Sequence, residues 1–250
     1  MKLQLSTWQD IEAYLKTSKS ILIPIGSTEQ HGPNGLIGTD ALCPEIIASA
    51  ADEIEPILIA PTFSVGNAQH HMAFPGSMTL RPSTMIATMQ DWTSSLQRHG
   101  FERIYWFNGH GGNTATMQAA FSEIYAGRSL EMGGANTQKD LRLKAINWWE
   151  LPGVMSVCKQ LFPTGDGMHA TASEVAVTYA GYPDQVRNVE MSPKIAPVGF
   201  FRDANHYRDI FPDGRIGSDP SRATVEKGNK IIEAAAKALL QDFKAFSTAS

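Results

Sequence analysis

Three side chains of the types that bind divalent metal ions stand close together in the sequence. Glu29 and His31 lie in the glycine- and proline-rich segment 26–33, and Asp40 follows nine residues after the histidine. In an extended backbone, Cα atoms two residues apart lie roughly 6.5 to 7 Å apart on one face, so Glu29 and His31 can reach two different ions. Two-metal hydrolase sites hold their ions about 3.5 to 4 Å apart, and Asp40 is the natural carboxylate bridge between them.

Two later segments carry donors of the same kinds. His110 lies in the segment Asn108–Asn113, whose three glycines let the backbone approach the histidine closely. The stretch from His169 to Glu174 offers an imidazole and a carboxylate at the start of an expected helix. Each motif taken alone also fits a surface pair, a turn or a hydrogen-bonded core group, and spacing does not decide between these interpretations and a metal site.

The segments that must position these donors alternate between strands and helices. Apolar, β-branched and aromatic runs predict strands at residues 21–25, 56–60, 103–107 and 141–148. Helical spacing predicts helices over residues 7–15, 41–54, 84–99, 114–125, 154–162, 173–179 and 224–246. A long loop is expected at 61–80, and the residues from 181 to 222 fit no element. This alternation predicts an α/β fold with a largely parallel sheet covered by helices on both faces.

The expected sheet explains why distant donors should meet. Ligands of open parallel sheets bind in the crevice beyond the carboxyl ends of the strands. Glu29 and His31 follow the first strand, and His110 follows the strand that ends at Phe107. We therefore expect both groups to face the same crevice.

Composition favours one globular domain over residues 1–250 with a small-molecule partner. The chain is 42% hydrophobic and 18% charged, and a net charge of −4 gives no general attraction to nucleic acid or anionic membranes. Cys43 and Cys158 lack a CxxC spacing and are expected to be buried free thiols. Neither a signal-peptide core nor a run of about 18 apolar residues is present, so a cytoplasmic location is expected.

The motifs together resemble the creatininase (creatinine amidohydrolase) family over about residues 20 to 235. The shared features are a Gly-x-x-Glu-Gln-His-Gly-Pro turn, an Asp nine residues on, an Asn-Gly-His loop and a later His-Ala segment that ends in Glu. The corresponding positions are 26–33, Thr39-Asp40, 108–113, and His169-Ala170 with Glu174. The segments 71–77 and 217–228 match as well.

The resemblance implies a three-layer α/β/α domain that binds two divalent ions, Zn, Mn or Fe. One ion would be bound by Glu29, Asp40 and His110, and the other by His31, Asp40 and Glu174. A hydroxide bridging the ions would attack the carbonyl carbon of a small amide, lactam, cyclic urea or formamide. The resemblance also implies a homo-oligomer, since the family tends toward homo-oligomers and often toward hexamers.

The resemblance also implies roles for residues around the ions. His169 is the expected catalytic proton shuttle to the leaving nitrogen. Residues expected to orient ligands or touch substrate are Gln30, His71, Gly111, Gly112, Asn113 and Trp149. His70, beside His71 on the long loop, is expected to be exposed.

Departures from the family pattern favour a substrate other than creatinine. Creatininases proper have Glu two residues after the histidine of the Asn-Gly-His loop, where this chain has Gly112. The His-Gly-Gly-Asn form is similar to formamide deformylases of flavin biosynthesis and to the mycofactocin-maturing peptidase. Asn34 stands where the family usually has His.

Other functional classes lack their motifs. No Gly-x-Ser-x-Gly elbow supports a serine hydrolase, and no Gly-x-Gly-x-x-Gly or Walker loop supports a nucleotide binder. The remaining alternative is a degenerate family member that binds a small molecule or a partner without turnover.

Overall fold

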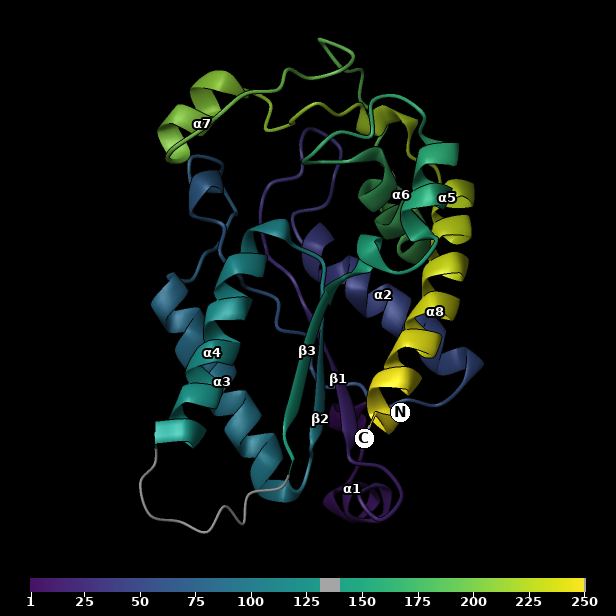
Figure 1. Cartoon of the computed structure of the whole chain (residues 1–250). Coiled ribbons are helices and arrows are strands. Elements are labelled where there is room, and N and C mark those ends of the chain that lie inside the picture. Colours follow the sequence, from purple (N-terminus) through teal and green to yellow (C-terminus); the bar gives the residue numbers. More distant parts are fainter. Residues whose placement is uncertain (131–139, 250) are drawn as a thin grey trace.

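A computed structural model describes residues 1–130 and 140–249 and contains a central parallel sheet (Figure 1). The strands lie in the order β1-β2-β3 and are β1 (Ser20–Ile25), β2 (Arg103–Asn108) and β3 (Arg142–Asn147). The register pairs Ile21 with Ile104 and Ile104 with Leu143. The predicted parallel sheet with helices on both faces is confirmed.

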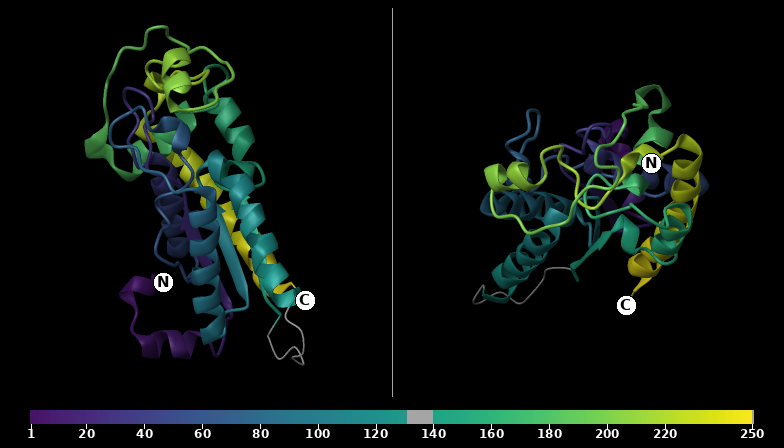
Figure 2. Two further views of the ribbon diagram at one scale, coloured as in Figure 1. Left: turned by 90° about the vertical axis from the view of Figure 1, so that its left-hand side faces the viewer. Right: turned by 90° about the horizontal axis from the view of Figure 1, so that it is seen from above.

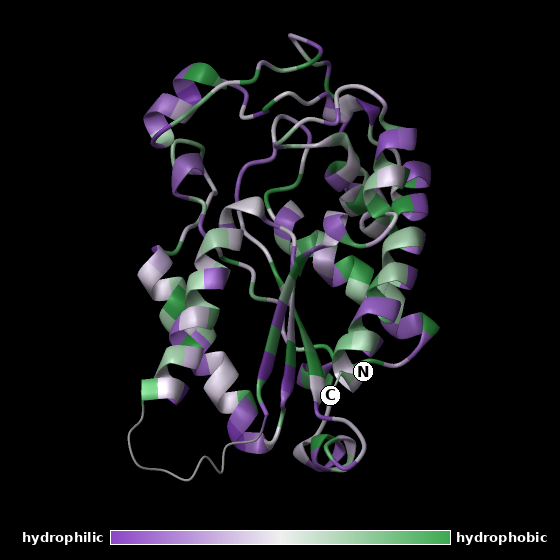
Figure 3. Cartoon of the chain, viewed as in Figure 1, coloured by the Kyte–Doolittle hydropathy of each residue, from purple (hydrophilic) through white to green (hydrophobic). Residues whose placement is uncertain are grey.

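The two faces of the sheet pack against different helices because side chains alternate along each strand. Leu22 and Tyr105 belong to a core that includes residues of α2, α5, α6 and α8, whereas Ile23 and Trp106 pack with residues of α3 and α4. Hydrophobic residues predominate along β1 (Figure 3). The helices are α1 (Trp8–Tyr14), α2 (Thr39–Ile54), α3 (Pro82–His99), α4 (Thr114–Leu130), α5 (Val154–Leu161), α6 (Ala172–Gly181), α7 (Ala204–Ile210) and α8 (Val225–Thr248).

The prediction of a regular strand at residues 56–60 is wrong. Its backbone runs beside β1 and makes isolated bridges, in which Leu22 N donates to Leu58 O and Ala60 N donates to Leu22 O. A regular parallel ladder would continue with a hydrogen bond from the backbone N–H of residue 24 and one from residue 62 to the carbonyl of residue 24. Pro24 has no N–H, and its carbonyl accepts from Phe63 N instead, so the ladder is interrupted. The apolar run is therefore buried against the sheet without forming a fourth strand.

Helix α2 begins two residues earlier than expected, with Gly38 as N-cap. Asp40 consequently lies in the first turn of a helix and not in the preceding loop. Helix α3 ends as predicted at Gly100, whose φ of 105° is the left-handed conformation of a glycine C-cap.

The segment that resisted assignment lies over the carboxyl ends of the strands. Figures 1 and 2 show α7 and the loops around it above the sheet, on the side to which β1, β2 and β3 point. A small apolar cluster of Tyr207, Phe211 and Ile216 holds this region together. Among the described helices, none is both long enough and apolar enough to cross a membrane.

Candidate metal centre

Close backbone packing places Asp40 next to the ends of two strands. A Cβ added at Gly26, directly after β1, would lie 2.1 Å from the Asp40 carbonyl oxygen, and one at Gly109, directly after β2, would lie 2.0 Å from it. Only glycine permits such an approach. The first turn of α2 therefore fits against both strand ends, and the Asp40 carboxylate faces residues that follow each strand.

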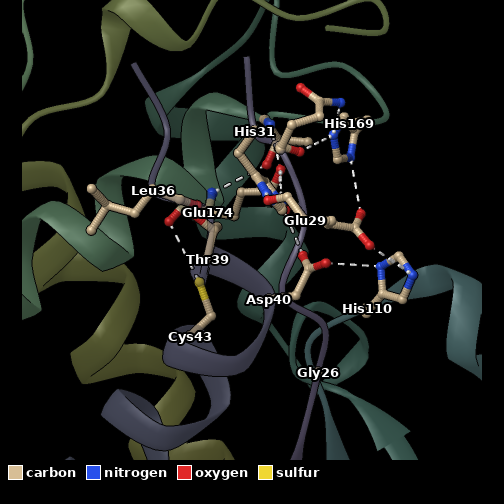
Figure 4. A network of polar contacts seen from close by, with 12 residues as sticks. Gly26, Glu29, His31, Leu36, Thr39, Asp40, Cys43, His110, His169 and Glu174 are labelled. Carbon is tan, nitrogen blue, oxygen red and sulfur yellow. Dashed lines mark hydrogen bonds and ion pairs between the residues drawn. The ribbon is translucent and has the colours of Figure 1, made fainter. Parts of the chain in front are cut away.

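Glu29 and His31 are held by the turn after β1. Glu29 N donates to Ile37 O, and His31 forms a bridge with Gly35. Both side chains are buried. Figure 4 shows the Glu29, His31, Asp40, His110 and Glu174 side chains converging on one region.

The converging donors form two sets that share Asp40. In the first set, His110 Nδ1 lies 2.8 Å from Asp40 Oδ2 and His110 Nε2 lies 3.3 Å from Glu29 Oε2. In the second, His31 Nε2 lies 3.0 Å from Asp40 Oδ1 and 3.9 Å from Glu174 Oε1. Within each set the potential ligand atoms lie within 4.8 Å of one another. Asp40 thus offers one oxygen to each set, which is the arrangement of a bridging carboxylate.

The hydrogen bonds of the two imidazoles fit metal ligation. His31 Nδ1 lies 3.0 Å from the Glu29 carbonyl oxygen, and His110 Nε2 lies 2.9 Å from the Asn67 carbonyl oxygen. A ring nitrogen that faces a carbonyl must carry the proton, so in a neutral imidazole the other nitrogen presents its lone pair. In both histidines that nitrogen faces an Asp40 oxygen. A lone pair against a carboxylate is repulsive, whereas a cation between them satisfies both.

Unpartnered carboxylate oxygens give a second indication that the residues fit cations. Both Glu29 oxygens and Asp40 Oδ2 are buried without an aligned hydrogen-bond donor, although imidazole nitrogens lie nearby. Buried charges that lack a partner are costly, and buried carboxylates are normally paired or bound to metal. The donor set therefore matches what two divalent ions require.

The pKa shifts of the residues in the centre also favour bound cations. Burial raises the pKa of Glu174 to about 7 and raises the pKa of Glu29. Burial opposes the charged form of His31, yet the neighbouring Asp40 carboxylate raises its pKa to about 10. Burial likewise opposes protonation of His110, but Glu29, Asp40 and the Asn67 carbonyl together outweigh it and raise that pKa to about 9. The carboxylates thus draw positive charge to these positions, and metal ions compete with protons for it.

Gln30 connects two further histidines to the centre. Its side-chain oxygen accepts from Gly32 N, so its amide nitrogen can donate to His71 Nδ1 and to Gly214 O, each at 2.9 Å, and its backbone carbonyl faces His169 Nε2. His71 is buried, and its Nε2 lies 3.0 Å from Glu29 Oε1. Burial, followed by the nearby His31, lowers the pKa of His71 to about 3. His71 is therefore a neutral imidazole whose Nε2 lies close to Glu29 Oε1 without forming an aligned hydrogen bond.

His169 lies at the edge of the centre, with one nitrogen tied to the backbone. Its Nε2 lies 2.8 Å from the Gln30 carbonyl oxygen, and its Nδ1 lies 3.8 Å from Glu29 Oε1. Burial lowers the pKa of His169 well below its usual value, and the nearby His71 lowers it further. Ala170 follows with a left-handed φ of 52°, a strained conformation of the kind that is concentrated at functional sites.

Glu174 has a structural role besides its place near His31. It is the third residue of α6 and completes a capping box with Thr171. The cap uses Oε1, which accepts from Thr171 N and is also the oxygen that lies 3.9 Å from His31 Nε2. A carboxylate oxygen has two lone pairs, so the cap and a metal contact are compatible. Structural and functional interpretations of this segment therefore both apply.

Asn113 links the ends of β1 and β2 to the long loop. Its Nδ2 donates to Gly26 O at 2.9 Å, and its Oδ1 accepts from Asn67 N at 2.9 Å. The Asn67 carbonyl in turn faces His110. Asn113 thereby supports the carbonyl that fixes the tautomer of His110.

The two neighbouring glycines of the His110 loop provide a matched test of this support. A Cβ at Gly112 would lie 2.4 Å from His110 Nε2 and 2.8 Å from Asn67 O, whereas a Cβ at Gly111 would meet nothing within 4 Å. We expect Gly112→Ala to displace the imidazole and to weaken metal binding by roughly 10- to 100-fold, the typical loss when a ligand's hydrogen-bond partner is removed. Gly111→Ala should bind metal as the wild type does.

Chelator competition with Zn²⁺ measures both glycine variants. The Gly111 variant controls for the smaller entropy of the unfolded chain, which both substitutions share. Equal affinities in the two variants would show that the hydrogen bond between His110 and Asn67 does not support the ligand.

A cavity of about 290 Å³ opens onto the two donor sets. Its walls include Trp149, which is half-buried, and Gly111 and Gly112. His70 also lines it, so the expectation of an exposed His70 is wrong. The imidazole is half-buried and stacks at 4.9 Å on Phe201, a residue of the unassigned segment. The adjacent pair His70-His71 was the one signal in the sequence for this contact.

The chain is similar to known proteins over most of its length. The sequence model of the family described as "Creatininase: Creatinine amidohydrolase" matches residues 4–243. Creatinine amidohydrolase of Pseudomonas putida is 28% identical over 248 residues, which cover 91% of this chain and 90% of that protein. The mycofactocin precursor peptide peptidase of Mycobacterium tuberculosis (strain ATCC 25618 / H37Rv) is 32% identical over 120 residues, covering 44% of this chain and 47% of that protein.

Solved structures share the fold over nearly the whole chain. A crystal structure of creatinine amidohydrolase (creatininase) has a TM-score of 0.85 at 22% identity and covers 100% of this chain and 98% of that chain. A glutamate-to-glutamine variant of creatininase of the Zn-Zn type has a TM-score of 0.83 at 25% identity, covering 99% and 98%. A creatininase structure described as the Mn form has a TM-score of 0.81 at 25% identity, with the same coverage.

Proposed function

The chain belongs to the creatininase family, and from this premise we propose that it hydrolyses the C–N bond of a small amide, lactam, cyclic urea or formamide with two divalent ions. The observation that carries the proposal is the sharing of Asp40 between two buried donor sets. Such sharing suits a pair of ions a few ångströms apart, as in two-metal hydrolases.

The residues present define where each ion would be held. Glu29, Asp40 and His110 would bind one ion, and His31, Asp40 and Glu174 the other. Zn, Mn and Fe are the candidates, because imidazole and carboxylate ligands suit them. The Zn-Zn and Mn forms of creatininase structures with this fold support the use of divalent ions.

When bound, the ions would supply Lewis acidity toward the substrate carbonyl and a water whose pKa falls from 15.7 to near 7. The chain's own groups then handle the protons. His169 Nδ1 faces the centre and would accept a proton from the attacking water and deliver it to the nitrogen that leaves as the C–N bond breaks. The hydrogen bond from His169 Nε2 to the Gln30 carbonyl would keep the ring in the orientation that this transfer needs.

Residues around the donor sets would hold them in place. His71 would contact Glu29, and the carbonyl of Asn67, supported by Asn113, would keep the Nε2 proton on His110. A histidine held in one tautomer by such a hydrogen bond keeps the ring nitrogen that would face the ion unprotonated. Gly112 leaves no carboxylate in the His110 loop, so Glu174 is the carboxylate available to the His31 position.

A substrate panel tests the proposal directly. We expect the Zn- or Mn-loaded protein to hydrolyse at least one member of a set of lactams, cyclic ureas, formamides and short peptides, and to lose that activity on chelation. Restoring the metal should restore turnover. A protein that binds two ions yet hydrolyses no member of the set would instead support the binding-module alternative.

A further inference from the structure

A second and larger cavity adjoins the metal centre. It has a volume of about 580 Å³ and lies between α5, the loop 163–168 and the start of α6. It shares three lining residues with the 290 Å³ cavity, namely Trp149, Met168 and Glu174. A molecule whose amide lies at the ions can therefore extend past Trp149 into the larger space.

The walls of the larger cavity are mainly apolar and sulfur- or ring-bearing. Trp148 and Trp149 meet edge to face at 5.7 Å on one side, and Met155, Cys158 and Phe162 contribute from α5 and its C-cap. Thioethers and indoles pack favourably against aromatic rings. These walls suit a flat, apolar group.

The polar groups of the cavity are not arranged to bind a charged ligand. Both oxygens of Asp166 already accept hydrogen bonds, from Ser173 N at 2.8 Å and from Ser173 Oγ at 3.1 Å. Lys159 is exposed on the surface of α5. Glu174 belongs to the metal centre. An apolar ligand therefore leaves no buried charge without a partner.

Two methionines at the cavity are unusually exposed for apolar residues. Met168 is 77% exposed and Met155 is 39% exposed. Covering such side chains removes apolar surface from water, at roughly 25 cal/mol per Å². A ligand that fills the cavity supplies that cover, and the flexible thioethers can adapt to its shape.

We propose that this cavity is a subsite for an aromatic or similarly sized apolar group attached to the amide that is hydrolysed. The inference rests on the proposed function, because the amide must lie at the ions for its substituent to reach the subsite. A cavity of about 150 Å³ already accepts benzene, so 580 Å³ has room for a ring and a short linker. The substrate class is then an amide or formamide with an apolar ring and not a bare small heterocycle.

Hydroxamates test the subsite without requiring turnover, because the hydroxamate group chelates a divalent ion. The affinity of the Zn-loaded protein is measured by calorimetry for acetohydroxamate, benzohydroxamate, phenylacetohydroxamate and 3-phenylpropionohydroxamate. We expect at least one phenyl compound to bind about tenfold or more tightly than acetohydroxamate, since each buried CH₂ contributes roughly a fourfold gain.

A matched pair of variants on α5 tests whether the tighter binding of the phenyl compounds depends on this cavity. Met155→Glu introduces a charge into the cavity, and Ser156→Glu introduces the same charge at the neighbouring exposed residue, which does not line it. We expect Met155→Glu to lose the phenyl gain and to bind acetohydroxamate normally, and Ser156→Glu to behave as the wild type.

The outcomes separate the subsite from the metal centre. If all four hydroxamates bind with equal affinity, or if the phenyl compounds still bind more tightly in Met155→Glu, the proposed subsite is overturned. Binding of acetohydroxamate would still support the metal centre in that case. Failure of acetohydroxamate itself to bind the Zn-loaded protein would overturn the proposed metal centre and the subsite with it.

Discussion

Asp40→Asn is expected to abolish binding of both ions and, with it, all hydrolysis. The two Asp40 oxygens face the two donor sets separately, at 3.0 Å from His31 and 2.8 Å from His110. Asparagine keeps the shape of the side chain but removes its negative charge and one oxygen. The loss of affinity should exceed the roughly 10- to 100-fold typical of changes outside the ligand set. Metal content after dialysis and turnover of the responsive amide measure the effect.

Glu174→Gln is the matched comparison for the Asp40 variant. Glutamine is accepted at the third position of a capping box, so α6 keeps its N-terminal cap. Glu174 contributes to one donor set only. We expect this variant to retain the Glu29, Asp40 and His110 position and to lose the other. Loss of both ions from each variant, or of neither, would contradict the assignment of Asp40 as the shared ligand.

His169→Ala is expected to retain both ions and to lower kcat by about 10²- to 10⁴-fold, the typical contribution of general acid-base catalysis. His169 has no place in the donor sets assigned to the ions, and it lines the 290 Å³ cavity with its Nδ1 3.8 Å from Glu29 Oε1. Because the proton-transfer group is lost, the pH profile of kcat should also flatten. Steady-state kinetics across pH with parallel metal analysis measure these changes.

Two controls separate chemistry from damage to the fold in this experiment. His99→Ala removes an exposed imidazole at the end of α3, which precedes the start of β2, whereas the centre follows the carboxyl end of that strand; the substitution should leave kcat unchanged. Added imidazole should partly restore activity to the His169 variant if the missing group transfers protons. Full activity in His169→Ala would remove this histidine from the reaction.

The position of the site could be predicted from the sequence because it depends on strand ends. Apolar strands followed by Glu29 and by His110 imply a shared crevice once the sheet is parallel, and the structure brings these side chains within 3.3 Å. Asp40 and Glu174 also lie where the motifs place them. Their roles as ligands stay predictions until metal is measured.

Features that depend on long-range packing could not be predicted. The segment 181–222 has little regular structure, so nothing in its pattern indicated that Phe201 would cover His70. The apolar run 56–60 predicts a strand, but it does not pair regularly because Pro24, in the neighbouring strand, interrupts the hydrogen-bond ladder. Periodicity describes one element at a time, whereas these outcomes are decided between elements.

The glycines of the His110 loop show the same limit at the scale of single residues. Sequence reasoning treats Gly109, Gly111 and Gly112 alike. In the structure, Gly109 and Gly112 have neighbours that exclude a side chain, and Gly111 has none within 4 Å. Only the packed structure distinguishes which glycine the site requires.

The metal content of the wild-type protein tests the central claim most directly. After loading with Zn²⁺ or Mn²⁺ and removal of excess metal, elemental analysis should give two ions per chain, and anomalous diffraction should place one on each side of the Asp40 carboxylate. A content well below one ion per chain, or ions located away from Asp40, would contradict the account.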